Sequence, residues 1–259
     1  GMASAAMMIY FGGKMPNWIL LIVIFAASAV AGMIWGVLPA IFKAYFNTNE
    51  TLFTLMLNYV AMQIVTFCIV FWENPAGSNT VGIINAATKA GWFPAIFGNA
   101  YTLNVIIVVA LTILVSVYMK YSKHGYEISV VGESQNTARY AGIDVKKVII
   151  RTMMISGAIC GIAGTIIVSG ASHTISTSTA GGRGFTAIIV AWMSKFNPLA
   201  MVLVSAFLVF MQQGSIQIAT QYGLNENASD IITGILLFFL IGCEFFINYK
   251  LEFRKKGEK

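Results

Sequence analysis

The stretch KYSKHGYEISVVGESQNTARYAGIDVKKVIIR, residues 120–151, is the most polar long segment of this chain. It lies between two apolar runs, residues 102–119 and 152–170, and it carries six of the sixteen Lys and Arg residues. A polar segment placed in this way is typical of a loop that joins two membrane-spanning helices. Its internal pattern predicts either an ordinary solvated loop or a helix on which a partner docks.

Residues 132–142 within this stretch predict a short helix with its own start and stop signals. Ser134 suits the N-cap, because its hydroxyl can accept a hydrogen bond from a backbone N–H two or three residues on. Gly142 can take the left-handed conformation that ends a helix, with Ile143 behind it. Asp144 can then cap the next helix, which enters the membrane. A helix of under three turns is marginal alone, so its own membrane helices or a partner protein must hold it.

The composition of the whole chain is that of an integral membrane protein. Hydrophobic residues make up 58% and charged residues 10%, and the mean hydropathy is +0.77. Globular chains are ~45–50% apolar and ~25% charged. The formal net charge of +6 does not indicate a nucleic-acid partner, because the basic residues cluster at the ends of apolar runs, where they orient helices in a membrane.

Several apolar runs are long enough to cross ~30 Å of hydrocarbon, which takes ~20 residues in a helix. Each must be a helix, because a lone strand would leave its backbone unpaired in lipid. The runs are residues 17–39, 52–72, 102–119, 152–170, 198–217 and 229–249. We therefore expect an all-α, polytopic membrane protein with about six spanning helices.

Residues 185–195 form an apolar run that is too short to cross the membrane. A helix of this length rises only ~17 Å, about half of a bilayer. The preceding residues, 169–184, contain almost no large apolar side chain. Irregular backbone at membrane depth persists only where it is buried in protein or lines a wet cavity. The pattern predicts a re-entrant segment followed by a half-helix.

The distribution of basic residues predicts the orientation of the chain. With residues 120–151 on the cytoplasmic side, thirteen Lys and Arg residues lie inside and three outside, as the positive-inside tendency requires. The balance holds only if residues 185–195 return from outside to inside. It makes residues 250–259 a cytoplasmic basic tail and residues 73–101 an extracellular loop. That loop is either a structural elbow at the membrane interface or a lid or binding-protein contact.

The sequence offers no constellation for catalysis. His124 and His173 fall on opposite sides of the membrane in this orientation, so they cannot share a metal or a triad. The cysteines, Cys68, Cys160 and Cys243, lie apart in apolar runs and are typical of small buried hydrophobes. Glu244 is interpreted as structural, paired with Lys250, in preference to a proton relay. With no phosphate-binding loop GxxxxGK[ST], we expect no metal site and no enzyme, and any ATP hydrolysis must come from another subunit.

A polar stripe on residues 52–72 is the candidate substrate pathway. Tyr59, Gln63 and Thr66 recur at i, i+4 and i+7 and so share one helix face, with Asn58 beside it. Such groups are costly in lipid and should point inward. They serve either hydrogen bonding between helices or the lining of a pathway for a neutral hydroxylated or heterocyclic solute.

Further pathway candidates lie later in the chain. Gln212 lies near the expected outer end of the 198–217 run. A half-helix that begins at Gly184 and Phe185 would direct its N-terminal dipole inward, and Phe185 would either stack on a base or sugar or simply pack.

Three blocks of sequence resemble one family. GESQNTARYAGIDVKKV, residues 132–148, looks like the cytoplasmic coupling segment, G-E-N-x-x-A-A-R-Y-A-G-I, of permease subunits of ABC importers for simple sugars and nucleosides, a branched-chain-permease-like family. GRGFTAIIVA, residues 182–191, followed by NPL at 197–199, agrees with it. TLMLNY, residues 54–59, is similar to the nucleoside branch. The chain departs from the pattern at Ser194 and Ala200, where Gly is usual, and at Gln212, near which Arg is common.

The resemblance implies a single transmembrane permease domain over residues 1–259, multi-pass in a bacterial cell (inner/plasma) membrane with a cytoplasmic C-terminus. It implies a second permease subunit, an extracellular binding protein and a cytoplasmic ABC ATPase that uses ATP and Mg, while this chain binds no cofactor. Family members carry further membrane segments upstream, so we expect a partial chain. The competing interpretations are a stand-alone secondary transporter or channel for a small neutral polar solute and, more remotely, an intramembrane enzyme.

The resemblance also assigns roles to residues. The ATPase-coupling candidates are Gly132, Glu133, Ala138, Arg139, Tyr140, Ala141 and Gly142. The substrate-pathway candidates are Asn58, Tyr59, Gln63, Thr66, Gly184, Phe185 and Gln212.

Overall fold

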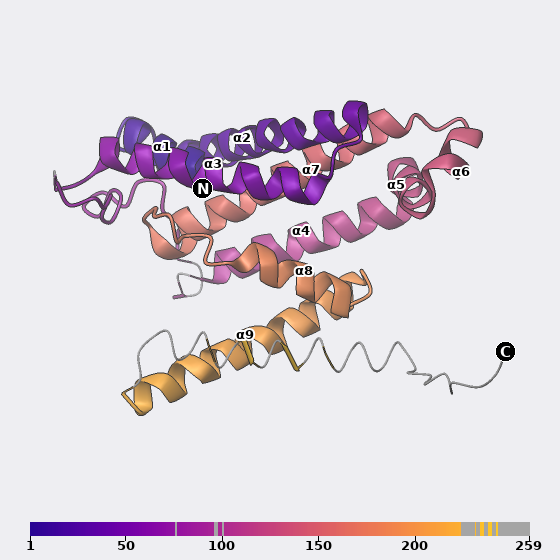
Figure 1. The fold of residues 1–259 in the computed structure, drawn as a ribbon. Coiled ribbons are helices and arrows are strands. Elements are labelled where there is room, and N and C mark those ends of the chain that lie inside the picture. The colour runs from indigo at the N-terminus through magenta and orange to yellow at the C-terminus, as the bar shows by residue number, and fades with distance from the viewer. Residues whose placement is uncertain are drawn as a thin grey trace. The chain divides into compact units, whose positions relative to one another are not determined.

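The computed structural model describes residues 1–223, apart from 76, 96, 97 and 100, together with positions 231, 234, 235, 238, 239 and 242. The described part is helical, with connecting loops (Figure 1). The elements in chain order are α1 (Met2–Phe11), α2 (Asn17–Phe46), α3 (Glu50–Trp72), α4 (Thr102–Tyr121), α5 (Lys123–Glu133), α6 (Gln135–Tyr140), α7 (Val145–Ile167), the π-turn η1 (Val168–Ser172), α8 (Arg183–Met193) and α9 (Pro198–Gln221).

The expected all-α membrane architecture is confirmed. Five helices in the described residues are long and apolar enough to cross a membrane, namely α2, α3, α4, α7 with η1, and α9. Each contains an expected span, and several extend beyond it. The longest is α2, which continues past Pro39 to Phe46. Most of the sixth expected span, residues 229–249, lies with Glu244 outside the described residues.

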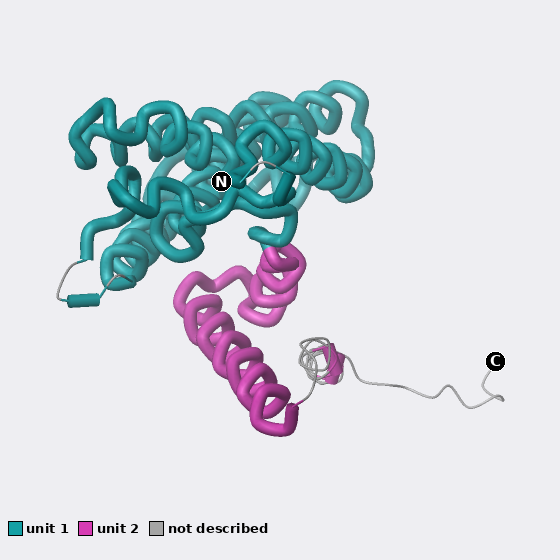
Figure 2. Tube along the Cα trace, turned by 90° about the vertical axis from the view of Figure 1, so that its left-hand side faces the viewer, with its two compact units in different colours: residues 1–180 teal, residues 181–259 magenta. Residues whose placement is uncertain are grey.

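The chain divides into two compact units, residues 1–180 and 181–259 (Figure 2). In the first unit, α2 and α7 lie along each other in unusually close contact. A Cβ on Gly32 would collide with the carbonyl oxygen of Gly157, and a Cβ on Gly161 would collide with that of Ser28. Small residues on both helices allow this approach, which is a common way for helices to pack in membranes.

The loop between α3 and α4 is folded into the core of the first unit. Val81, Ile84 and Ala90 are buried with residues of α1 and α2. Asn85 donates from its amide to the carbonyl oxygens of Met8 (2.7 Å) and Ala90 (3.0 Å). The described part of this loop is therefore built as a structural element. We call this part of the first unit, residues 73–95 with η1, the loop end.

The irregular segment before α8 is shorter than expected. Residues 168–172 continue α7 as a π-turn, so the break in the helix comes at His173, which takes a left-handed conformation (φ 51°). The half-helix is present as α8, in the second unit, and it begins after Gly182, which is also left-handed (φ 69°). Its 11 residues match the expected length, with both bounds two residues earlier than predicted.

Candidate functional site

The short helix α6 has the caps that the sequence predicts. The hydroxyl of Ser134 accepts a hydrogen bond from the backbone N–H of Thr137 (3.3 Å). At the other end Gly142 has φ 76°, and the N–H of Ile143 donates to the carbonyl oxygen of Ala138 (2.9 Å). These bonds satisfy backbone groups that a six-residue helix leaves free at both ends. The prediction of a separately capped helix is confirmed.

The side chains of α6 divide into an enclosed side and an exposed side. Ala138 is fully buried, so it holds α6 against its own chain and offers no surface to a partner. Tyr140 is 94% exposed, an unusual position for an aromatic ring, and Arg139 and Ala141 beside it are also exposed. Among the other coupling candidates, Gly132, Glu133 and Gly142 are exposed. The arrangement offers one ring and one guanidinium to whatever approaches this end of the unit.

The start of α7, directly after α6, is also held in place. Asp144 caps α7 by accepting from the N–H of Lys147 (3.3 Å), and the Lys147 ammonium lies 3.2 Å from the same carboxylate. These bonds hold the pKa of Asp144 below its ordinary value. Val145 and Val148, in the first turn of α7, are buried. The start of α7, which follows α6 directly, is therefore fixed both by its cap and by packing.

A charged pair joins α5 to α7. Arg151 donates to the carboxylate of Glu127 at 2.6 Å, and His124 lies 3.6 Å from the same group. The hydrogen bond from Arg151 is the main reason why the pKa of Glu127 is lowered. Sequence reasoning did not identify this pair, because Gly125 and Gly132 obscured α5 as a helix. The spacing of His124 and Glu127, three residues apart, was the available signal.

We call the segment α5–α6 with the start of α7 the coupling end of the first unit; it lies at the opposite end of the helices from the loop end (Figure 1). A hollow of about 340 Å³ is lined by α5, the turn at residues 141–144 and the start of α7, with Glu127, Gly142 and Arg151 among its lining residues.

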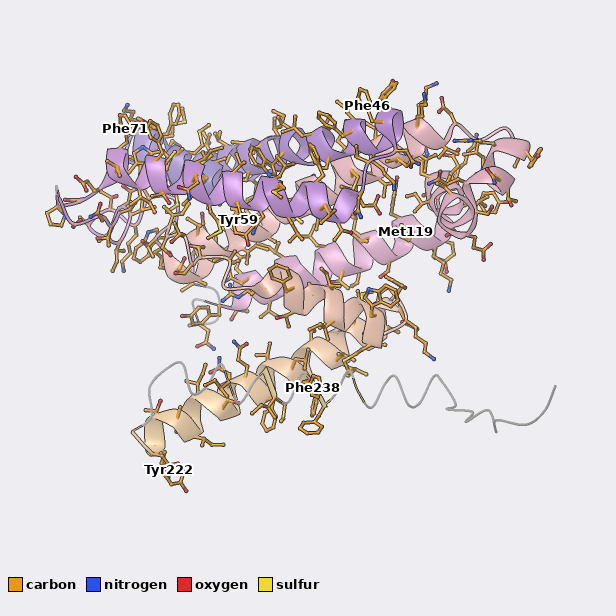
Figure 3. The ribbon with its side chains drawn as sticks, viewed as in Figure 1. Phe46, Tyr59, Phe71, Met119, Tyr222 and Phe238 are labelled. Atoms are coloured by element: carbon orange, nitrogen blue, oxygen red, sulfur yellow. The ribbon has the colours of Figure 1, made fainter. Side chains whose placement is uncertain are left out.

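The polar stripe of α3 lies on the surface of the first unit. Asn58, Tyr59, Gln63 and Thr66 are all exposed, with Tyr59 at 66% (Figure 3). The hydroxyl of Thr66 donates to the carbonyl oxygen of Met62 (3.0 Å), which satisfies it within its own helix. The sequence predicts that this stripe points inward, whereas in the first unit it faces away from the core.

The remaining pathway candidates belong to the second unit. Gly184 and Phe185 lie in the first turn of α8, and the Phe185 ring is 59% exposed. Gln212 is exposed on α9, a helix whose N-cap Asn197 accepts from the N–H of Leu199 (3.1 Å). The side chains of Phe185 and Gln212 are open to a solute or a neighbouring chain. Within the described residues, no group of His, Cys, Asp and Glu is arranged to hold a metal ion.

Comparison with known proteins gives a consistent result over most of the chain. A family profile described as "Branched-chain amino acid transport system / permease component" matches residues 1–241. The guanosine ABC transporter permease protein NupP of Bacillus subtilis (strain 168) is 29% identical over 246 residues, covering 93% of this chain and 70% of the relative. No solved structure matches.

Two further relatives are also named as ABC transporter permease proteins. The nucleoside ABC transporter permease protein NupB of Lactococcus lactis subsp. cremoris (strain MG1363) is 27% identical, covering 94% of this chain and 72% of the relative. The glucose ABC transporter permease protein TsgB13 of Haloferax volcanii is 26% identical, covering 94% of this chain and 67% of the relative.

Proposed function

Because this chain belongs to the branched-chain amino acid transport system / permease component family, we propose that it is the membrane-spanning permease subunit of an ATP-driven importer of nucleosides or simple sugars. It forms part of the substrate pathway and carries no ATPase of its own. ATP and Mg are used by a cytoplasmic ABC ATPase, which docks on residues 133–142. The membrane is the bacterial inner or plasma membrane, with the coupling end and the C-terminus on the cytoplasmic side.

The observation that carries this proposal is the geometry of α6. A helix of six residues is capped at both ends, seated through a fully buried Ala138, and presents Tyr140 with 94% of its surface exposed. Exposed aromatic and Arg side chains on a rigid base are typical of the centre of a protein interface. It packs against α5 and, less extensively, against the start of α7, and α7 packs along α2, so we expect a pull on α6 to be transmitted to the membrane helices.

The names of the relatives support the substrate class. Two relatives are named for guanosine or nucleosides and one for glucose. The exposed stripe of Asn58, Tyr59, Gln63 and Thr66 supports a neutral polar solute, because it offers hydrogen-bonding groups and one aromatic face without a charge. Nucleosides are the preferred class, since the block at residues 54–59 is similar to the nucleoside branch. The exposed stripe also suits a second permease subunit, which would enclose the pathway, and an extracellular binding protein would deliver the solute.

The test is to purify the full-length permease in mild detergent and to measure ATPase activity in the eluate. We expect a co-purifying ATPase, and we expect Arg139→Glu to reduce its recovery about tenfold or more, because a reversed charge at an interface is strongly repulsive. Lys120→Glu is the matched control, since it makes the same charge change on an exposed residue outside α6. An ATPase-free eluate with intact permease would instead favour the stand-alone transporter, to be tested by ion-coupled flux.

A further inference from the structure

The loop end contains a hollow whose function has not been discussed above. Its volume is about 330 Å³, close to the lower limit for sites that hold one small organic molecule. Three segments far apart in the sequence contribute to it, namely the start of α2, the 73–95 loop and the π-turn with the residue after it. Its walls include Asn17, Lys89, Trp92, Phe93, Gly170 and His173.

Two aromatic walls of the hollow are held in place. The Trp92 indole stacks on the His173 imidazole with ring centroids 3.8 Å apart and planes 8° from parallel, and its Nε1–H donates to the carbonyl oxygen of Ile84 (2.9 Å). The Phe93 ring is 8% exposed and stacks on Phe25 at 5.7 Å. Both flat surfaces are therefore fixed before any solute arrives, which reduces the entropic cost of binding.

His173 has several features that packing alone does not require. Its backbone is in the left-handed region (φ 51°), directly after a π-turn, and its carbonyl oxygen accepts from the N–H of Ile84 (2.8 Å). Strained residues and π-turns are concentrated at functional sites. Its Nδ1 is buried and has no hydrogen-bond partner among the described residues. Burial also lowers the pKa of His173, so the ring is neutral at pH 7. Since Nδ1 is enclosed, Nε2 is the ring nitrogen left to meet a solute.

The polar groups of the hollow select against a sugar. Both ends of the Asn17 amide are already occupied, since it accepts from the N–H of Gly91 (2.7 Å) and donates to the carbonyl oxygen of Trp92 (3.2 Å). The carbonyl oxygen of Gly170 accepts from the Asn104 amide (2.9 Å). A sugar carries hydroxyls on every side and would leave many unpaired here. A planar base carries its hydrogen-bonding groups only along its edge, so the faces that stack on the aromatic walls leave no polar group unpaired.

We propose that this hollow is a binding site for a neutral, planar heterocycle such as a nucleobase, which stacks against the Trp92–His173 pair and bonds at its edge. This inference rests on the proposed function and deepens it, because it places the recognition of the base at the loop end of the permease. Lys89, an exposed residue of the lining, opposes a cationic solute, and the other lining residues that the structure describes include no Lys or Arg that would favour an anion.

The test uses the complete importer in proteoliposomes, with labelled guanosine and labelled glucose as the probes. Trp92→Leu removes one flat wall, and His173→Asn removes the ring while keeping a residue type that tolerates the left-handed backbone. We expect each variant to raise KM for guanosine about tenfold with little change in kcat, since a stacked base contributes roughly that much binding. Trp18→Phe, which alters an exposed Trp outside the hollow, is expected to leave KM unchanged.

The possible outcomes separate this inference from the proposed function. If the wild-type importer shows no ATP-driven uptake, the proposed function fails. If uptake is normal but KM for guanosine is unchanged in His173→Asn, the site is overturned, and an effect on glucose alone overturns the heterocycle preference. Should Trp92→Leu not fold, guanosine quenching of Trp fluorescence in the purified full-length permease replaces it. Quenching that survives in Trp92→Phe would overturn the site, and quenching retained in Trp18→Phe but lost in Trp92→Phe supports it.

Discussion

The coupling end and the loop end of the first unit both connect membrane helices, but different kinds of hydrogen bond hold them. The coupling end is held by caps within a few residues of each other, such as Ser134 to Thr137 and Asp144 to Lys147. The loop end is held by bonds that span the chain, such as Asn85 to Met8 and Asn17 to Gly91. One end exposes its helix to a partner, whereas the other encloses a small hollow.

This difference teaches how each end should respond to change. Loss of a cap at the coupling end removes a bond between neighbouring residues, so a substitution there should leave the membrane helices folded. Long-range bonds connect segments of the core, so damage at the loop end should lower the stability of the whole first unit. The close α2–α7 pair belongs to both ends, and its loss should affect both.

The largest effect is expected at the α2–α7 pair. Gly157→Leu would place a side chain against the carbonyl of Gly32, and we expect it to lower the free energy of unfolding by about 3 kcal/mol, at the upper end for overpacking. Thermal unfolding in detergent measures the loss. Gly214→Leu is the control, because a Cβ there meets nothing within 4 Å. Equal stability of the two variants would show that the helices separate easily.

A smaller but still global effect is expected at the loop end. Asn85→Leu removes the amide that bonds to the carbonyls of Met8 and Ala90; the Met8 carbonyl keeps its bond from the N–H of Gly12, and leaving the Ala90 acceptor unpaired costs about 1–3 kcal/mol. We expect the melting temperature of the first unit to fall. Thr88→Leu, at an exposed position of the same loop, should have little effect. If only the hydrogen-exchange protection of the loop fell, with the melting temperature unchanged, the loop end would unfold locally, as expected for the coupling end.

The same contrast explains what the sequence could predict. The caps of α6 and α7 were predictable because Ser134, Gly142 and Asp144 act on neighbours a few residues away. The membrane spans followed from hydropathy and length. The pairing of Gly32 with Gly157, the hollow at His173 and the Arg151–Glu127 pair depend on contacts between residues far apart in the chain, which no local pattern specifies. The candidate pathway residues were predicted as a stripe, and their role stays a prediction.

A local effect is expected from removing the N-cap of α6. Ser134→Ala should destabilise this helix by about 1 kcal/mol, while Ser134→Asp keeps an acceptor for the N–H of Thr137. Hydrogen exchange of residues 135–140 should quicken in the first variant alone. The thermal unfolding of the membrane helices should be unchanged in both. A lower melting temperature in Ser134→Ala would contradict the local character of this end.

The smallest expected effect is that of acid on folding stability, and the two ends should lose stability at different pH values. Burial lowers the pKa of His173, so the folded chain binds fewer protons there than the unfolded chain; stability is full above the ordinary His pKa of about 6.5 and falls as pH drops below it. Arg151 lowers the pKa of Glu127, so its contribution is full above the ordinary Glu pKa of about 4.3 and is lost as pH falls through the lowered value.

Melting temperature measured against pH should therefore show two steps in the wild-type chain. His173→Asn should remove the step that begins near neutrality, at the loop end, and Glu127→Gln should remove only the more acidic one, at the coupling end. Because the Glu127 carboxylate is only partly buried and solvent screens its pair with Arg151, the second step should be the weaker and should shrink in high salt. A single step that disappears in both variants would mean that the two ends unfold as one, and that the α2–α7 pair joins them more firmly than the local caps imply.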